Sequence, residues 1–183
     1  MRRFTVEVMR RLDAAGIDSV LPDLPGTNES LAPLDAQSLG AWQAAMAAAV
    51  DHFGATHLLA VRGGCLAVPA SLPGWLYAPV KGGSILRQML RARTLASKEA
   101  GREESRDELT TLALAQGIEL AGYRIGPQLF ADLEEAQAPD REGLSPIEQG
   151  TVGGSGLWLR AEPGESRELA DALAAVLTIG MRA

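Results

Sequence analysis

The sequence predicts an α/β fold in which helices pack on a parallel sheet. Between residues 4 and 68, short apolar runs alternate with amphipathic helical patterns in the order helix, strand, helix, strand, helix. Strands joined through helices in this way lie parallel, with right-handed crossovers. The length of 183 residues indicates a single domain, and a content of 46% hydrophobic and 22% charged residues indicates a globular one.

Helix signals recur along the chain. Phe4 and Leu12 fall on one face of the first expected helix, and Gly16 provides its stop. Ser105 stands three residues before Glu108, which is the spacing of a capping box. Helices are expected over residues 4–15 and 38–53, as a short turn from Cys65, and from Ser84, Ser105, Pro127 and Ser166, the last ending at Leu177.

Strands are expected at short apolar runs that end in turn residues. Residues 138–156 are rich in proline, glycine and acidic residues and predict a surface loop, while residues 97–106 predict a charged link. Residues 118–125 predict either a short strand or one arm of a hairpin. The other expected strands cover residues 17–21, 56–61, 74–80, 157–161 and 178–183.

The most informative stretch is THLLAVRGGCLAV, residues 56–68. Its apolar run suits a strand buried on both faces, which then turns through two glycines into a helix. In α/β-hydrolases this geometry is the nucleophile elbow, with a serine between small residues. Here Arg62 occupies the serine position. Because a guanidinium stays protonated and cannot attack a carbonyl, the stretch predicts the architecture of an elbow without its nucleophile.

Neither histidine completes a catalytic triad. His52 and His57 both precede the turn, whereas the α/β-hydrolase order places the histidine last. We interpret both as structural. Cys65 is an alternative nucleophile, because a helix N-terminus and nearby Arg62 would lower the pKa of its thiol. The competing interpretation is that Cys65 packs as a small residue against the sheet.

Other residues considered for catalysis, metal binding or cofactor binding give weaker support for such a role. Asp23 stands between two prolines, where an aspartate either bonds its own turn or serves a chemical role. The two histidines and one cysteine lack the spacing of a metal site. The glycines within residues 150–156 precede an expected strand rather than following one, unlike a dinucleotide loop. We therefore expect neither a metal nor a cofactor.

Anion binding is the chemistry that remains. Arg62, the amides of Gly63 and Gly64, and Lys81 after the next strand would meet at the carboxyl edge of the sheet. We expect such a pocket to hold a carboxylate, a phosphate or an acidic side chain. Alternatively, Arg62 pairs with an acid such as Glu162, which would follow the next strand of the sheet.

Charge and cysteine content narrow the class of protein. A net charge of −6 argues against binding of a nucleic-acid backbone. A single cysteine fits a reducing compartment, and no apolar run approaches the length of a membrane span, about 18 residues. The first residues, MRRFTVEVMRRLD, lack the apolar region of a signal peptide. We expect a cytoplasmic protein.

Four segments together resemble a known family. These are VLPDLPGTNES at 20–30, LLAVRGGCLA at 58–67, LYAPVKGGSILRQMLRAR at 76–93 and IELAGYRI at 118–125. They resemble the α/β-hydrolase superfamily, and in particular the type 2 hydrolase-like proteins encoded with exosortase A systems. The resemblance covers most of the chain, and the last two segments are its specific part.

The resemblance implies a partial α/β-hydrolase-like parallel sheet with flanking helices and a helical cap insertion at about 84–135. It also implies a setting in bacterial exopolysaccharide and protein-sorting systems, and it places Glu162 where the superfamily often has its acid. Against this pattern, the chain begins at the helix before the PDLPG-like segment and has no histidine after residue 57. We therefore expect the first strands and their oxyanion loop to be absent, and a homodimer or a partner protein to cover the exposed edge.

The sequence leaves three hypotheses for function. The first is a non-catalytic α/β-hydrolase-like protein that binds a small anionic ligand or a partner protein near Arg62. The second is an active hydrolase of small esters or thioesters that uses a non-serine nucleophile such as Cys65. The third is an assembly subunit without a ligand, which predicts an apolar patch on the sheet edge and a dimer in solution.

Overall fold

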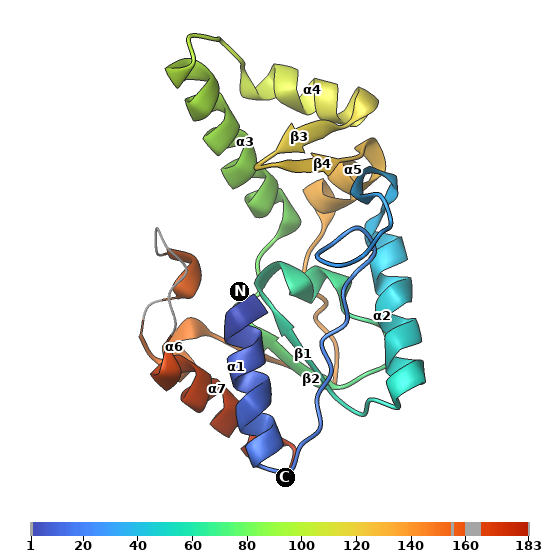
Figure 1. The fold of residues 1–183 in the computed structure, drawn as a ribbon, viewed down its shortest axis with the longest axis vertical. Coiled ribbons are helices and arrows are strands. Elements are labelled where there is room, and N and C mark those ends of the chain that lie inside the picture. Colours follow the sequence, from blue (N-terminus) through green and yellow to red (C-terminus); the bar gives the residue numbers. More distant parts are fainter. Residues whose placement is uncertain (1, 155, 160–165, 183) are drawn as a thin grey trace. The chain divides into compact units, whose positions relative to one another are not determined.

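The computed structural model describes residues 2–154, 156–159 and 166–182. The fold is mixed α/β (Figure 1). It has flanking helices and a three-stranded parallel sheet in the order β1-β2-β5. The chain forms two compact units, one of residues 22–144 and one of residues 1–21 with 145–183. In the described part of the chain, no helix is both long enough and apolar enough to span a membrane.

Among the residues that the structure describes, the parallel sheet has fewer strands than the sequence predicts, and its strand β1 is less buried than expected. β1 (Leu58–Val61) pairs in parallel with β2 (Gly74–Tyr77), with Leu58 opposite Gly74 and Val61 opposite Tyr77. All four residues of β1 are only half-buried. The expectation of a strand buried on both faces is therefore wrong, because β1 is an edge strand of a three-stranded sheet.

The third strand, β5 (Leu144–Ile147), lies where the sequence predicts a loop. The short helix α6 (Gln149–Val152) follows it, so the prediction of a continuous loop over residues 138–156 is wrong. Pro146 lies inside β5 and hides the strand from pattern analysis. A proline is compatible with a strand at the edge of a sheet, where its missing N–H leaves no partner unbonded.

The helix expected before β1 is confirmed, and so are the residues expected at its start and its end. α2 spans Leu39–Phe53, and the Ser38 hydroxyl accepts a hydrogen bond from the amide of Ala41 at 3.0 Å. Gly54 ends the helix in the left-handed conformation, with φ of 61°. A third contact ties its start to a distant helix, because the Asp132 carboxylate accepts from the amide of Leu39 at 2.8 Å. A negative charge at this end also complements the helix dipole.

The segment after β2, residues 82–135, forms a small α/β layer of its own. It lies where the resemblance implies a helical cap insertion, and we call it the insertion below. It consists of α3 (Gly82–Glu99), α4 (Arg106–Gln116), the antiparallel hairpin β3 (Ile118–Leu120) and β4 (Tyr123–Ile125), and α5 (Pro127–Glu135). Ser105 and Glu108 form the expected capping box, and Pro127 occupies the first turn of α5. Residues 118–125 thus hold both arms of a hairpin, where the sequence predicts a short strand or one arm. The turn residues of the hairpin, Ala121 and Gly122, both have positive φ.

The elements of the insertion share one hydrophobic core. The buried residues from these elements are Leu86, Leu90, Leu109, Ala113, Ile118, Leu120, Ile125, Leu129, Phe130 and Leu133, joined by Leu66 from the segment after β1. α3 starts at Gly82, two residues before the expected Ser84, because a glycine fits against the end of α5 there. A Cβ atom at Gly82 would collide with the carbonyl oxygen of Leu133.

The charged link between α3 and α4 is tied to α3. The Glu104 carboxylate accepts from Arg93 Nη2 at 2.6 Å and from the hydroxyl of Ser97, which is 2% exposed. The hydrogen bond from Arg93, together with that from Ser97, lowers the pKa of Glu104 to about 2. The sequence shows only charged residues here. In the structure, the hydrogen bonds of Arg93 and Ser97 to Glu104 connect α3 to the link that follows it, and we call this group of three residues the clasp.

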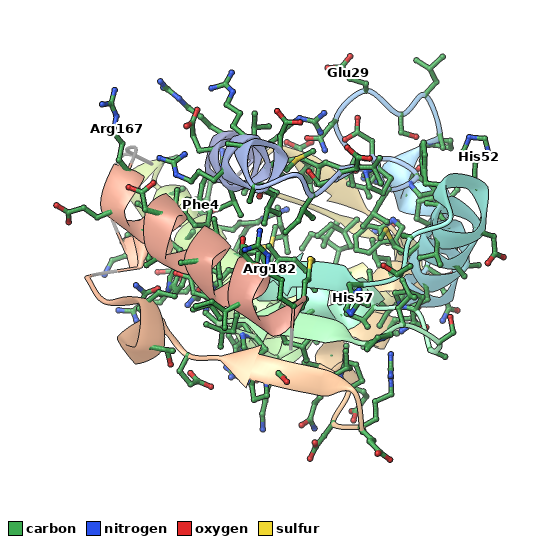
Figure 2. The ribbon with its side chains drawn as sticks, turned by 90° about the horizontal axis from the view of Figure 1, so that it is seen from below. Phe4, Glu29, His52, His57, Arg167 and Arg182 are labelled. Carbon is green, nitrogen blue, oxygen red and sulfur yellow. The ribbon has the colours of Figure 1, made fainter. Side chains whose placement is uncertain are left out.

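In the smaller unit, α1 (Arg2–Ala14) packs on α7 (Arg167–Gly180). Figure 2 shows Phe4 pointing from α1 toward α7. Ser166 caps α7 as expected, by accepting from the amide of Leu169 at 3.3 Å. The buried faces of the two helices consist of Phe4, Val8 and Leu12, and of Leu169, Ala170, Leu173, Ala174 and Leu177.

Three predicted strands of this unit are wrong. Residues 17–21 form no strand, and Val20 and Leu21 are 50% and 37% exposed. Leu157–Leu159 is a turn of 3-10 helix, η3, and Arg160 and Ala161 lie outside the described residues. α7 continues through Gly180, where a strand was predicted from residue 178. A short apolar run becomes a strand only where a neighbour accepts its backbone hydrogen bonds.

We expect Gly82→Ala to lower the free energy of unfolding by about 1–3 kcal/mol, because the added methyl group overlaps the backbone of α5. The matched control is Gly64→Ala, since no atom lies within 4 Å of the position that its Cβ would occupy; its effect should stay within about 0.5 kcal/mol. Urea denaturation of the three proteins measures both values. Equal stability of the two variants would contradict the packing described here.

We expect Glu104→Gln to lower the melting temperature at pH 7, because the clasp to Arg93 and Ser97 is lost. The folded-state pKa of Glu104 lies below its usual value of 4.5. Its carboxylate therefore stabilises the fold above about pH 4.5, and this contribution is lost as the pH falls toward 2. The difference between variant and wild type should shrink over that range. Glu103→Gln, at an exposed neighbour, serves as the control; a difference that persists unchanged at pH 2 would argue against the clasp.

Candidate functional site

Arg62 lies at the tip of a strained turn, as the elbow pattern predicts. It follows β1 directly and has φ of 54°, in the left-handed region that side chains other than glycine seldom adopt. The chain then enters a 3-10 helix, η2 (Arg62–Ala67), in place of the expected start of an α-helix. Strain of this kind is retained where the surrounding structure holds it and is concentrated at functional sites.

A second strained residue lies beside the first. Ala78 follows β2 directly, and its φ is 46°. Val61 and Tyr77 are register partners, so Arg62 and Ala78 are neighbours just beyond the carboxyl edge of the sheet. Arg62 Nη1 donates a hydrogen bond to the Ala78 carbonyl oxygen at 3.2 Å. The guanidinium therefore lies across the ends of both strands, which is the edge where open α/β sheets bind ligands.

The Arg62 side chain is half-buried. Burial lowers the pKa of the guanidinium, while Cys65 and Tyr77 act in the opposite direction. An arginine pKa starts so high that the group keeps its charge at neutral pH. A partly desolvated, permanent positive charge at a sheet edge favours contact with an anion.

The other predicted ligand-binding residues lie close in sequence to the ends of the two strands, and no contact of Lys81 with Arg62 is observed among the described residues. Gly63 approaches α3 closely, since a Cβ there would lie 3.1 Å from Ile85 Cδ1. Gly64 is exposed and has open space around it. Lys81 is exposed at the N-cap of α3. The alternative partner of Arg62, Glu162, lies outside the described residues, so that pairing stays a prediction.

Cys65 is poorly placed for nucleophilic attack. Its side chain is fully buried in a small cluster with Val68 and Leu76. Burial raises the pKa of the thiol to about 12, although nearby Arg62 opposes the change. A thiol in this environment stays protonated at neutral pH and is shielded from a substrate. The geometry favours the packing interpretation of Cys65.

The histidines lie away from the elbow. His52 is exposed at the end of α2, with its ring edge-on to Phe53, and Figure 2 shows His52 and His57 on different elements. His57 stands just before β1, its ring stacked on Trp75 with centroids 5.7 Å apart. The extended chain from His57 to Arg62 covers roughly 16 Å. His57 therefore cannot act as a base at the elbow, in agreement with a structural role.

Asp23 bonds its own turn. Its carboxylate accepts from Asn28 Nδ2 at 2.9 Å and from the amide of Glu29 at 3.4 Å. These bonds favour a structural role for Asp23 over a chemical one. In the described part of the chain, no three histidine, cysteine or acidic side chains gather as a group that could hold a metal ion.

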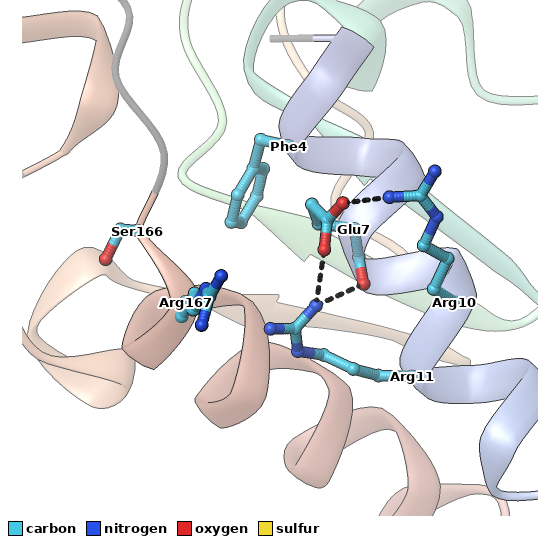
Figure 3. A pocket seen from close by; sticks show the side chains of 6 residues that line it. All are labelled: Phe4, Glu7, Arg10, Arg11, Ser166 and Arg167. Carbon is cyan, nitrogen blue, oxygen red and sulfur yellow. Dashed lines mark hydrogen bonds and ion pairs between the residues drawn. The ribbon is translucent and has the colours of Figure 1, made fainter.

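Two pockets were not predicted from the sequence. One has a volume of about 470 Å³, between the facing surfaces of α1 and α7 (Figure 3). The Glu7 carboxylate accepts there from Arg10 and from Arg11, the latter at 3.0 Å, and Arg11 also pairs with Asp171. Its lining residues are Phe4, Glu7, Arg10, Arg11, Ser166 and Arg167. Only the packing of two helices from opposite ends of the chain creates it.

The second pocket lies on the insertion, and we name it the arginine pocket. Its volume is about 570 Å³. It is lined by Ser84, Arg87, Gln88, Arg91, Thr94 and Arg106. The sequence signal for it is the arginine-rich helix after Ser84, but the contribution of Arg106 depends on how α4 folds back along α3.

Comparison of the chain with protein-family models, curated proteins and solved structures found no match.

We expect the Cys65 thiol of the native protein to resist an aromatic disulfide reagent at pH 8, because it is buried and its pKa is raised. The chain has one cysteine, so unfolding in guanidinium should release one reactive thiol per molecule. The rate of labelling with and without denaturant measures the protection. Labelling of the native protein at the rate of a free thiol would revive Cys65 as a nucleophile.

Proposed function

We propose that this protein is a non-catalytic, α/β-hydrolase-like binding protein that holds an anionic ligand or the acidic group of a partner beside Arg62. The observation that carries the proposal is the position of Arg62. It occupies the tip of the strained turn after β1, and its guanidinium is oriented across the sheet edge by the bond to Ala78. A serine at this tip would attack a carbonyl, whereas an arginine there can only bind and polarise.

The surroundings of Arg62 support binding rather than catalysis. Gly64 leaves the backbone close to Arg62 in the sequence open to approach, and Lys81, three residues after Ala78, is exposed. Cys65, the alternative nucleophile, is buried with a raised pKa. A hydrolase needs a nucleophile with a base in hydrogen-bond reach, so hydrolysis of small esters or thioesters is the outcome that the experiment below must test.

We place this protein, as a proposal, in an exosortase and exopolysaccharide-type system. The support is the resemblance of residues 58–67, 76–93 and 118–125 to hydrolase-like proteins of those systems. A cytoplasmic location is part of the proposal, since a lone unpaired cysteine suits a reducing compartment.

A homodimer or a partner protein also belongs to the proposal. The observation in its favour is β1, an edge strand of the three-stranded sheet, with every residue only half-buried. Edge strands with unpaired backbone groups favour association unless something covers them. Size-exclusion chromatography with light scattering would measure the oligomeric state.

We expect Arg62→Ala to weaken the binding of acetate, succinate and inorganic phosphate by about tenfold or more, because each charge-assisted hydrogen bond contributes about 1.5–3 kcal/mol. Thermal shift and calorimetric titrations at fixed ionic strength measure the change. Arg102→Ala, which removes an exposed arginine elsewhere, should leave binding unaltered.

The same proteins should show no turnover of activated short-chain esters and thioesters. Unchanged anion binding in Arg62→Ala would refute the proposed function. Turnover by the wild type that disappears in Cys65→Ala would establish a cysteine hydrolase instead.

A further inference from the structure

The arginine pocket is built on one face of α3 and the start of α4. Ser84, Arg87, Gln88, Arg91 and Thr94 recur at helical spacing along α3, so their side chains share a face. Arg106 enters from the first position of α4.

The inner faces of the two helices hold the pocket in place. Leu86 and Leu90 of α3 and Leu109 of α4 are each 2% exposed and belong to the same core. The clasp between Arg93 and Glu104 fixes the connection between the helices. The helices that carry the three arginines are thus held in place, and the three side chains are exposed on their outer faces.

The arginines of this pocket have no carboxylate partner at ion-pair distance in the described part of the chain, although the chain as a whole carries a net charge of −6. The arginines concerned are Arg87, Arg91 and Arg106. Arg87 and Arg91 are four residues apart on one helix, where like charges destabilise each other. Neighbouring Arg93, in contrast, pairs with Glu104.

The pocket between α1 and α7 provides an internal comparison. There Glu7 pairs with Arg10 and Arg11 (Figure 3), and Asp171 also pairs with Arg11. The protein therefore supplies carboxylates for Arg10 and Arg11, whereas Arg87, Arg91 and Arg106 have none at ion-pair distance among the described residues. A bound anion would relieve the repulsion among the latter three.

We propose that the arginine pocket binds a phosphate-bearing small molecule. Guanidinium groups bind phosphate oxygens in a bidentate manner, and three of them match a group with two or three negative charges. The Ser84 hydroxyl accepts from Arg87 Nη2 at 2.6 Å, which orients Arg87 and leaves the hydroxyl its own proton to donate. Gln88 adds an amide that can both donate and accept.

The size of the pocket favours a small molecule over a polymer. Its volume of about 570 Å³ is of the size of small-molecule sites, about 300–1,000 Å³, and it is an open hollow, since Arg87, Gln88, Arg91 and Arg106 are exposed. A nucleic acid would need a long basic surface, which the negative net charge of the chain does not provide. The inference is independent of the proposed function at Arg62, because the two sites share no residue.

The experiment is a calorimetric titration of the full chain with inorganic phosphate, pyrophosphate and a nucleoside diphosphate, at constant ionic strength. The uncharged nucleoside is the ligand control. The variants are Arg91→Gln and Arg106→Gln, and the control is Arg102→Gln, an exposed arginine outside both sites. Arg62→Gln is measured beside them, because it removes the anion site proposed at the elbow and so separates the two sites. We expect each pocket variant to weaken pyrophosphate binding about tenfold or more, and Arg102→Gln to stay within about twofold of the wild type.

The melting temperature without ligand is a second readout. Because Arg91→Gln removes a like charge from the pocket, it should raise the melting temperature at low salt while it abolishes most of the stabilisation by pyrophosphate. A lower melting temperature than that of the wild type, with the phosphate-induced shift retained, would overturn the proposal.

Other outcomes distinguish the arginine pocket from the Arg62 site and a small molecule from a protein partner. Binding that is lost in Arg62→Gln but kept in Arg91→Gln and Arg106→Gln would assign the anion to the elbow, in support of the proposed function and against the arginine pocket. Absence of binding for all three phosphate compounds would overturn the inference. Tighter binding of an acidic peptide than of pyrophosphate would replace the small molecule with a protein partner.

Discussion

The hydrophobic core of the insertion is the constraint on which both candidate sites depend. Leu66 from η2 joins it, and this anchors the segment directly after Arg62. Leu86 and Leu90 join it from α3, and this turns the arginine-bearing face of that helix outward. One buried cluster thus sets the position of the strained turn and the orientation of the arginine pocket. Loosening it would disturb both sites together.

Arginine at the tip of the turn changes what this architecture can do. The strand, the positive φ and the helical turn place one side chain at the sheet edge whatever its chemistry. With a guanidinium at the tip, the same backbone presents a fixed positive charge, and its bond to Ala78 spans the ends of β1 and β2. The turn fixes where the side chain lies. The chemistry of that side chain then determines whether it can attack a substrate or only bind one.

Charge pairing separates arginines that maintain structure from those available to a ligand. Arg11 and Arg93 each have a carboxylate partner from another segment, and they hold helices or connections together. Arg87, Arg91 and Arg106 line a concave surface and have no such partner in the described part of the chain. The number of arginines in a sequence is therefore less informative than the position of the acids around them.

The sequence by itself determined the locally encoded features: α1, α2 with Ser38 and Gly54, the capping box at Ser105, Pro127 at the start of α5 and the strained turn at Arg62. Each depends on contacts within a few residues. Tertiary structure alone decided which apolar runs became strands. Residues 17–21 found no pairing partner, whereas Leu144–Ile147 formed β5 despite Pro146. It also brought Arg106 to α3, because side chains distant in sequence meet only when helices pack.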